Sequence, residues 1–154
     1  MDSNEVMKAA QALDISNFLG VFAADQLCGI GKNQVGTLIV NTDPFYLEGQ
    51  HWISICLGDK DIYLYDSLCL DVYKSEYFSK FLIYMNKHLH YNTIRTQSLE
   101  SIMCGYHALV FCYVMKTGGS EHIFRSFLKT FKSYNVINRE QLSLTYFTLV
   151  RKNE

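Results

Sequence analysis

The stretch CGYHALVFCYVMK, residues 104–116, determines how the rest of the chain is arranged. Its side chains are apolar around the whole circumference that a helix would have, so the helix that it predicts must be buried on all sides. Gly118 and Gly119 follow, and glycine commonly ends helices. We therefore expect a central buried helix against which the remaining elements pack.

Upstream of this helix lie two strand-like runs, HWISICL at 51–57 and DIYLYDS at 61–67. Gly58, Asp59 and Lys60 join them, and a short turn of this composition between apolar runs is typical of a β-hairpin. The β-branched residues at 35–40 predict another strand, which ends at a turn over 41–44. A weaker alternation of apolar and polar residues at 91–97 predicts one further strand.

Helices are expected at 4–13, at 23–27 after a break at Gly20, at 75–87, at 121–133 and from 138 onward. Ser75 is the expected cap of the third, and Gln141 the capping-box partner of Asn138. The pattern indicates an α+β fold in which a small, mostly antiparallel or mixed sheet packs against helices.

The composition limits the classes of function. At 154 residues, 49% apolar and 19% charged, residues 1–154 are expected to form one packed domain. A net charge of -1 argues against binding nucleic acid or an anionic membrane. No apolar stretch approaches the roughly 20 residues that span a bilayer, and residues 1–10 lack a signal-peptide core, so we expect an intracellular protein. The five cysteines include no C-x-x-C pair, which favours a reducing compartment.

Cys104 is the candidate nucleophile, because it begins the buried helix. Free amide groups and the helix dipole at that end stabilise a thiolate and lower the pKa of the thiol. Gly105 carries no side chain that would obstruct a substrate backbone. The alternative is a buried structural cysteine, and this is how we interpret Cys112, two turns further along.

A nucleophilic cysteine needs a base with an orienting partner. His88 and His90 follow a helix end and are expected at the surface, without further ligands at metal-binding spacing. His107 points along the buried helix, and His122 begins a solvent-facing one. His51 differs, because the predicted hairpin offers it a carboxylate.

That carboxylate is Asp66, and the hairpin register decides whether it reaches His51. A two-residue loop at 58–59 pairs His51 with Asp66 directly, and one at 59–60 pairs Asp66 with Ile53 and leaves His51 on the same face. A three-residue loop would separate them. Gln97, seven residues before Cys104 and at the expected end of a strand, could donate its amide to an oxyanion beside the Cys104 backbone N–H.

The order of these residues, together with VNTDPFYLEGQHWISI, YLYDS and QSLESIMCGYHALVF, resembles the adenovirus-protease-like (adenain-like) cysteine peptidases. These are encoded by DNA viruses and virus-like DNA transposons and are distantly related to SUMO-specific proteases. The resemblance covers most of residues 18–113, with weaker support from FLGVFAADQL.

The resemblance implies specific roles. Cys104 would be the nucleophile, His51 the base and acid, Asp66 its orienting carboxylate, and Gln97 an oxyanion-hole donor. The family tends to cut after Gly-Gly-type sequences, which requires a narrow tunnel. Trp52 is a candidate wall of that tunnel, and a core aromatic is the alternative.

The sequence also departs from the family. The acid is Asp66 where adenovirus enzymes use glutamate, and Met103 stands where the SUMO-protease branch usually has aspartate. The chain is shorter than most SUMO-protease domains, which favours the viral or transposon branch. Adenovirus protease uses a peptide activator and DNA, but no residue here matches the peptide and the charge argues against the DNA.

We therefore expect a cysteine endopeptidase, without cofactor or metal, that cleaves viral capsid or core precursor proteins after Gly-Gly-type sites during virion maturation. Its partner would be a polypeptide substrate, with no membrane, and its location the host nucleus or cytoplasm and the virion. The alternatives are a SUMO- or ubiquitin-like-protein-specific isopeptidase, a binding module with a vestigial site, and a metal-binding protein.

Overall fold

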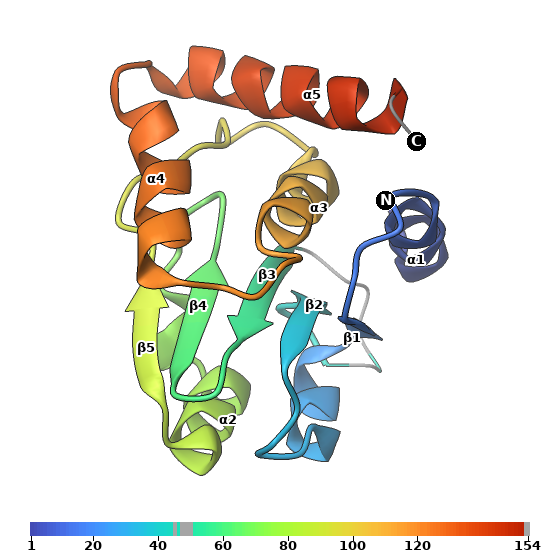
Figure 1. Cartoon of the computed structure of the whole chain (residues 1–154), viewed down its shortest axis with the longest axis vertical. Coiled ribbons are helices and arrows are strands. Elements are labelled where there is room, and N and C mark those ends of the chain that lie inside the picture. Colours follow the sequence, from blue (N-terminus) through green and yellow to red (C-terminus); the bar gives the residue numbers. More distant parts are fainter. Residues whose placement is uncertain (45, 47–50, 153–154) are drawn as a thin grey trace.

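The computed structural model describes residues 1–44, 46 and 51–152. Its strands form one sheet with helices on both sides, and the last three helices follow all the strands in the chain (Figure 1). The strands are β1 (Phe18–Phe22), β2 (Gly36–Asn41), β3 (Trp52–Leu57), β4 (Asp61–Tyr65) and β5 (His88–Tyr91). The α-helices are α1 (Ser3–Ala12), α2 (Glu76–Met85), α3 (Cys104–Val114), α4 (Glu121–Lys132) and α5 (Val136–Lys152). Two short 3-10 helices, η1 (Ala24–Gly29) and η2 (Val72–Lys74), complete the order.

The strands form one mixed sheet in the order β1-β2-β3-β4-β5. β2, β3 and β4 are antiparallel neighbours, while β1 and β5 run parallel to β2 and β4 at the two edges. The parallel pairing of β4 with β5 requires a crossover, and η2 and α2 supply it. The α+β class that the sequence predicts is thus confirmed.

Both faces of the sheet are covered, which explains why its central strands read as continuous apolar runs. Alternate residues of each strand point to opposite faces. Ile39, Cys56 and Tyr63 join a core with α1, α3, α4 and α5. Leu38 and Ile55 join a second core with η1 and α2 on the other side. The sheet therefore separates two apolar layers.

α3 occupies the centre of the larger layer. It packs against β2, β3, α1 and α5, and in Figure 1 α5 lies across its far side. Residues 105 and 107–112 are all buried, as expected for a helix without a polar face. Among the described residues, no helix combines the length and apolar character needed to span a bilayer. The buried position of α3 fixes where its first residue, Cys104, is presented.

The β3–β4 hairpin adopts the second of the registers considered above. Ser54 pairs with Tyr65, and the amide of Gly58 donates to the Asp61 carbonyl at 2.8 Å, with Asp59 and Lys60 at the tip. Its continuation places Asp66 on the strand face that His51 shares. The register thus brings the two candidate side chains together rather than separating them.

Two predictions about local structure are wrong. Residues 92–97 are irregular, and the edge strand lies earlier, at His88–Tyr91, because tertiary hydrogen bonds to the 66–67 loop hold the predicted segment out of the sheet. The last helix begins at Val136 rather than Asn138. The Asn135 side chain accepts from the Asn138 amide at 2.9 Å and so supplies the cap that we assigned further along.

Candidate active site

The candidate residues come from the ends of three elements that lie side by side. His51 immediately precedes β3, Asp66 immediately follows β4, and Cys104 is the first residue of α3. Because β3 pairs antiparallel with β4 and α3 packs on β3, the structure brings these three residues together where β3 begins and β4 ends. Gln97 lies in the irregular segment between β5 and α3, not at the end of a strand as the sequence indicated.

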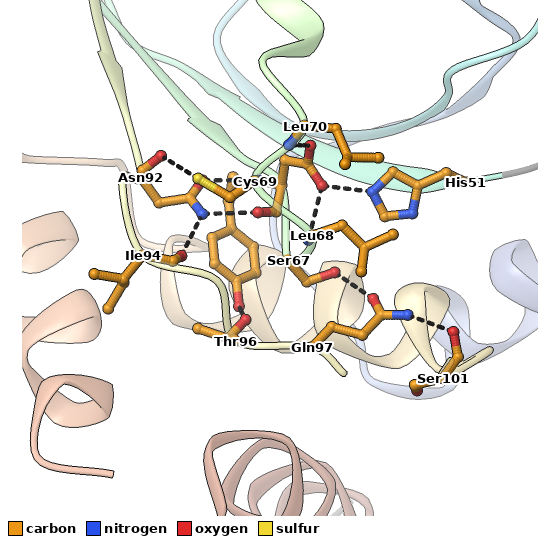
Figure 2. Close-up of polar contacts among 12 residues, drawn as sticks. His51, Ser67, Leu68, Cys69, Leu70, Asn92, Ile94, Thr96, Gln97 and Ser101 are labelled. Carbon is orange, nitrogen blue, oxygen red and sulfur yellow. Dashed lines mark hydrogen bonds and ion pairs between the residues drawn. The ribbon is translucent and has the colours of Figure 1, made fainter. Parts of the chain in front are cut away.

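His51 and Asp66 form a buried hydrogen-bonded pair. The Nε2 atom of His51 lies 2.5 Å from Oδ1 of Asp66, a contact drawn as a dashed line from His51 in Figure 2. The two residues are only 5% and 3% exposed. A charge-assisted bond of this length is among the stronger side-chain interactions. Because Nε2 faces the carboxylate, Nδ1 is the ring nitrogen left for the thiol of Cys104.

Backbone amides hold the Asp66 carboxylate in place. The Leu68 amide donates to Oδ1 at 3.0 Å and the Leu70 amide donates to Oδ2 at 2.8 Å. Burial favours the neutral acid, but the bonds from His51 and from these two amides outweigh burial and lower the pKa of Asp66. The carboxylate is therefore negatively charged when it meets the imidazole.

The Asn92 side chain fixes the backbone of Asp66. Its Oδ1 accepts from the Asp66 amide at 2.9 Å, and its Nδ2 donates to the Asp66 carbonyl at 2.7 Å. The same nitrogen also donates to the Ile94 carbonyl at 3.0 Å. Asn92 is buried, so the residue acts as a clamp between β4 and the irregular segment.

The Cys104 thiol and the His51 imidazole interact, and each shifts the pKa of the other. Burial opposes ionisation of the thiol, yet His51 and the backbone amides of Trp52 and Gly105 lower the pKa of Cys104. Burial also opposes protonation of His51, yet its bonds to Asp66 and Cys104 raise the pKa of His51 to about 9. Both shifts favour a thiolate beside an imidazolium over a neutral thiol beside a neutral imidazole.

Gln97 is buried and held at both ends of its side-chain amide. Its Oε1 accepts from the Ser67 hydroxyl at 2.6 Å, and its Nε2 donates to the Ser101 carbonyl at 2.8 Å (Figure 2). An amide nitrogen carries two hydrogens, so one remains for another acceptor after the bond to Ser101. The role of Gln97 in an oxyanion hole stays a prediction.

Trp52 and Gly105 are both contacted by the first residue of the chain. The Trp52 indole Nε1 donates to the Met1 carbonyl at 2.8 Å, and a Cβ added to Gly105 would lie 2.9 Å from the Met1 sulfur. Trp52 is buried and belongs to the larger core. That Trp52 also walls a substrate tunnel stays a prediction.

Cys112, His107 and His90 have hydrogen-bond partners or surroundings other than the His51–Asp66 pair. Cys112 is fully buried in the core, as expected, and burial strongly raises the pKa of its thiol. His107 is buried on α3, and its Nε2 lies 3.3 Å from Glu140 Oε1 on α5. His90 pairs with Asp61 at 2.9 Å on the sheet edge. In the described part of the chain, no three His, Cys, Asp or Glu side chains are grouped as a metal ion would require.

Sequence reasoning missed Asn92, Ser67 and Met1. Asn92 bonds to Asp66, 26 positions away, and Ser67 bonds to Gln97, 30 positions away, and only the fold reveals such partners. Ser67 had one available signal, because it follows Asp66 directly in the DS pair. Met1 carried no signal, because nothing in its neighbours links it to Trp52.

No family model and no curated protein matches the chain. Among solved structures, the chain is similar to the ASFV pS273R protease, with a TM-score of 0.40 and 17% sequence identity. The match covers 75% of this chain and 43% of that one, so this chain spans less than half the length of that protease.

Proposed function

We propose that this protein is a cysteine peptidase in which Cys104 is the nucleophile and His51 the general base and acid. One observation carries the proposal. Nε2 of His51 lies 2.5 Å from the buried carboxylate of Asp66, and interaction with His51 lowers the pKa of the Cys104 thiol. Acyl transfer requires this arrangement, in which a base lies between a nucleophile and an acid that orients the base.

The chemistry follows from the charges of the site. The Cys104 thiolate attacks the scissile carbonyl carbon, and the negative charge that forms on the oxygen is stabilised by the Cys104 amide and by Gln97. His51 gives its proton to the leaving amine, which leaves a thioester on Cys104. A water molecule, deprotonated by His51, then hydrolyses the thioester and restores the thiolate. Asp66 holds the ring in place throughout and stabilises its protonated form.

The proposed substrates are viral capsid or core precursor proteins, cut after Gly-Gly-type sequences during virion maturation. The motifs around His51, Asp66 and Cys104, which resemble adenovirus-protease-like peptidases, support this proposal. The enzyme would act in the host nucleus or cytoplasm and in the virion.

The decisive variant is Cys104→Ala, with Cys112→Ala as the matched control on the same helix. Cys104→Ala should abolish cleavage of a peptide that contains Gly-Gly, whereas Cys112→Ala should keep the rate per folded molecule. Cleavage at the wild-type rate by purified Cys104→Ala protein would exclude the proposal.

A second candidate is an isopeptidase for SUMO- or ubiquitin-like proteins, and the aspartate at position 66 favours it because that branch uses aspartate. Activity probes that carry an electrophile at the C-terminus of each ubiquitin-like protein separate the candidates. Rapid labelling of Cys104 supports the isopeptidase, and no labelling by an enzyme that cleaves the Gly-Gly peptide supports the viral endopeptidase.

A further inference from the structure

Ser67 connects two parts of the site that are distant in sequence. Its hydroxyl donates to Oε1 of Gln97 at 2.6 Å, and its backbone carbonyl accepts from the amides of Thr96 at 2.9 Å and Gln97 at 3.0 Å. Ser67 is 2% exposed, so these bonds are shielded from competing water. Figure 2 shows the Ser67 hydroxyl directed at the end of the Gln97 side chain.

The second partner of Gln97 determines which way its amide faces. The Ser101 carbonyl can only accept a hydrogen bond, so the nitrogen of the Gln97 amide must be the atom that faces it at 2.8 Å. The amide oxygen is then turned toward Ser67, whose hydroxyl donates to it. Two bonds, one at each end, fix both the position of the amide and its rotation, which a single bond would not do.

We propose that Ser67 is a positioning residue for Gln97, holding the amide so that its second N–H is directed at the oxyanion formed on Cys104. The proposal deepens the proposed peptidase function and rests on it. Because Ser67 is next to Asp66 in the chain, one short loop then sets both the carboxylate that orients His51 and the amide that stabilises the oxyanion.

A double-mutant cycle tests this role through Gln97. Ser67→Ala removes one neutral hydrogen bond, so kcat should fall about five- to tenfold with KM unchanged. Gln97→Ala should lower kcat about 10²- to 10³-fold. In the Gln97→Ala background, Ser67→Ala should have almost no further effect on kcat. A loss of the same size in both backgrounds would show that Ser67 acts independently of Gln97 and would overturn the proposal.

Ser54→Ala is the matched control. Ser54, on β3, is also a fully buried serine, but its hydroxyl has no hydrogen-bond partner among the described residues. Its replacement should leave kcat and KM unchanged. An equal loss of kcat in Ser54→Ala and Ser67→Ala would show that replacing any buried serine lowers kcat. That result would exclude a specific role for Ser67 in positioning Gln97.

A second measurement uses no substrate, and the variants in it can be catalytically inactive. In a ¹⁵N spectrum, the Gln97 side-chain NH₂ group, assigned by its loss in Gln97→Ala, should resonate away from the position of a solvated glutamine and exchange slowly with water. Ser67→Ala should move it toward that position. A solvent-like Gln97 amide in the wild-type protein would overturn the proposal even if peptidase activity is shown, and a fixed amide in a protein without peptidase activity would overturn only the proposed function.

Discussion

Asp66 reaches His51 diagonally across the β3–β4 hairpin. The register that pairs Ser54 with Tyr65 places Asp66 opposite Ile53, yet its Oδ1 lies 2.5 Å from Nε2 of His51. The diagonal approach depends on the side-chain torsions of Asp66, which the Leu68 and Leu70 amides fix. Orientation of the imidazole is therefore a property of the 66–70 loop as much as of the strands.

Asp66→Asn should impair catalysis with little change in shape. The amide has no charge to stabilise the imidazolium, so kcat should fall about 10²-fold or more and the pKa of His51 should drop from about 9. The alkaline limb of the rate profile should move to lower pH, as measured with a Gly-Gly peptide. Asp61→Asn is the control, because it disrupts the same kind of pair with His90 away from the site. A profile with an unmoved alkaline limb would contradict the assignment of Asp66.

The wild-type rate profile should be bell-shaped. On the acid side, activity rises as Cys104 ionises at a pKa below that of an ordinary thiol. On the alkaline side, activity falls as His51 loses its proton near pH 9, because the leaving amine then receives no proton. Both limbs belong to the coupled pair rather than to either residue alone.

Iodoacetamide offers a direct test of the same ion pair. At neutral pH it should alkylate Cys104 in the native protein, while Cys112 reacts only after unfolding because it is fully buried. Mass spectrometry of peptides from protein treated over a series of pH values gives the rate at each thiol. Modification of Cys104 only above the pKa of a free thiol, about 8.5, would show that no thiolate is stabilised.

Asn92→Ala should weaken both the fold and the site. It leaves the Asp66 amide and carbonyl without their buried side-chain partner, at a cost of about 2–3 kcal/mol in the free energy of unfolding. The Asp66 carboxylate would also lose its fixed position, so kcat per folded molecule should fall. Urea denaturation and peptide kinetics measure the two effects, with Asn33→Ala at an exposed position as the control. Unchanged stability would mean that the clamp contributes nothing.

Two serine-to-alanine changes should shift stability in opposite directions. Ser143 on α5 is 2% exposed and its hydroxyl has no partner among the described residues, so Ser143→Ala should stabilise the protein by about 1 kcal/mol. Ser120 caps α4 by accepting from the Ile123 amide at 3.1 Å, so Ser120→Ala should destabilise it by about 1 kcal/mol. Thermal unfolding of the two variants measures these changes in stability. Shifts of the unfolding temperature in the same direction would contradict the roles assigned to the two hydroxyls.

The sequence predicted those helices and strands whose apolar pattern matches the way they are buried in the fold. The apolar run at 104–116 predicted α3, and the hairpin composition predicted β3 and β4, because burial on all sides leaves a pattern that can be read directly. Of the alternative registers, only the structure could select one, since a turn of two residues fits either of two positions.

The elements that the sequence missed are fixed by distant neighbours. The strand at His88–Tyr91 lacks an apolar pattern because it lies at the edge of the sheet and is partly exposed. Residues 92–97 alternate like a strand but are held by Asn92 and Ser67 in an irregular path. In the site, the types and order of the four candidates could be read from the sequence, whereas the bonds that orient them could not.

The contacts of Met1 have a practical consequence for preparing the protein. The Met1 carbonyl and sulfur lie against Trp52 and Gly105, beside the nucleophile. A purification tag joined ahead of Met1 would therefore place its own residues beside Trp52 and Gly105, the residues proposed to bind substrate, and so would the few residues that remain after tag removal. Assays that compare proteins with different leading residues would then compare different binding sites, so all kinetic variants should share one identical starting residue.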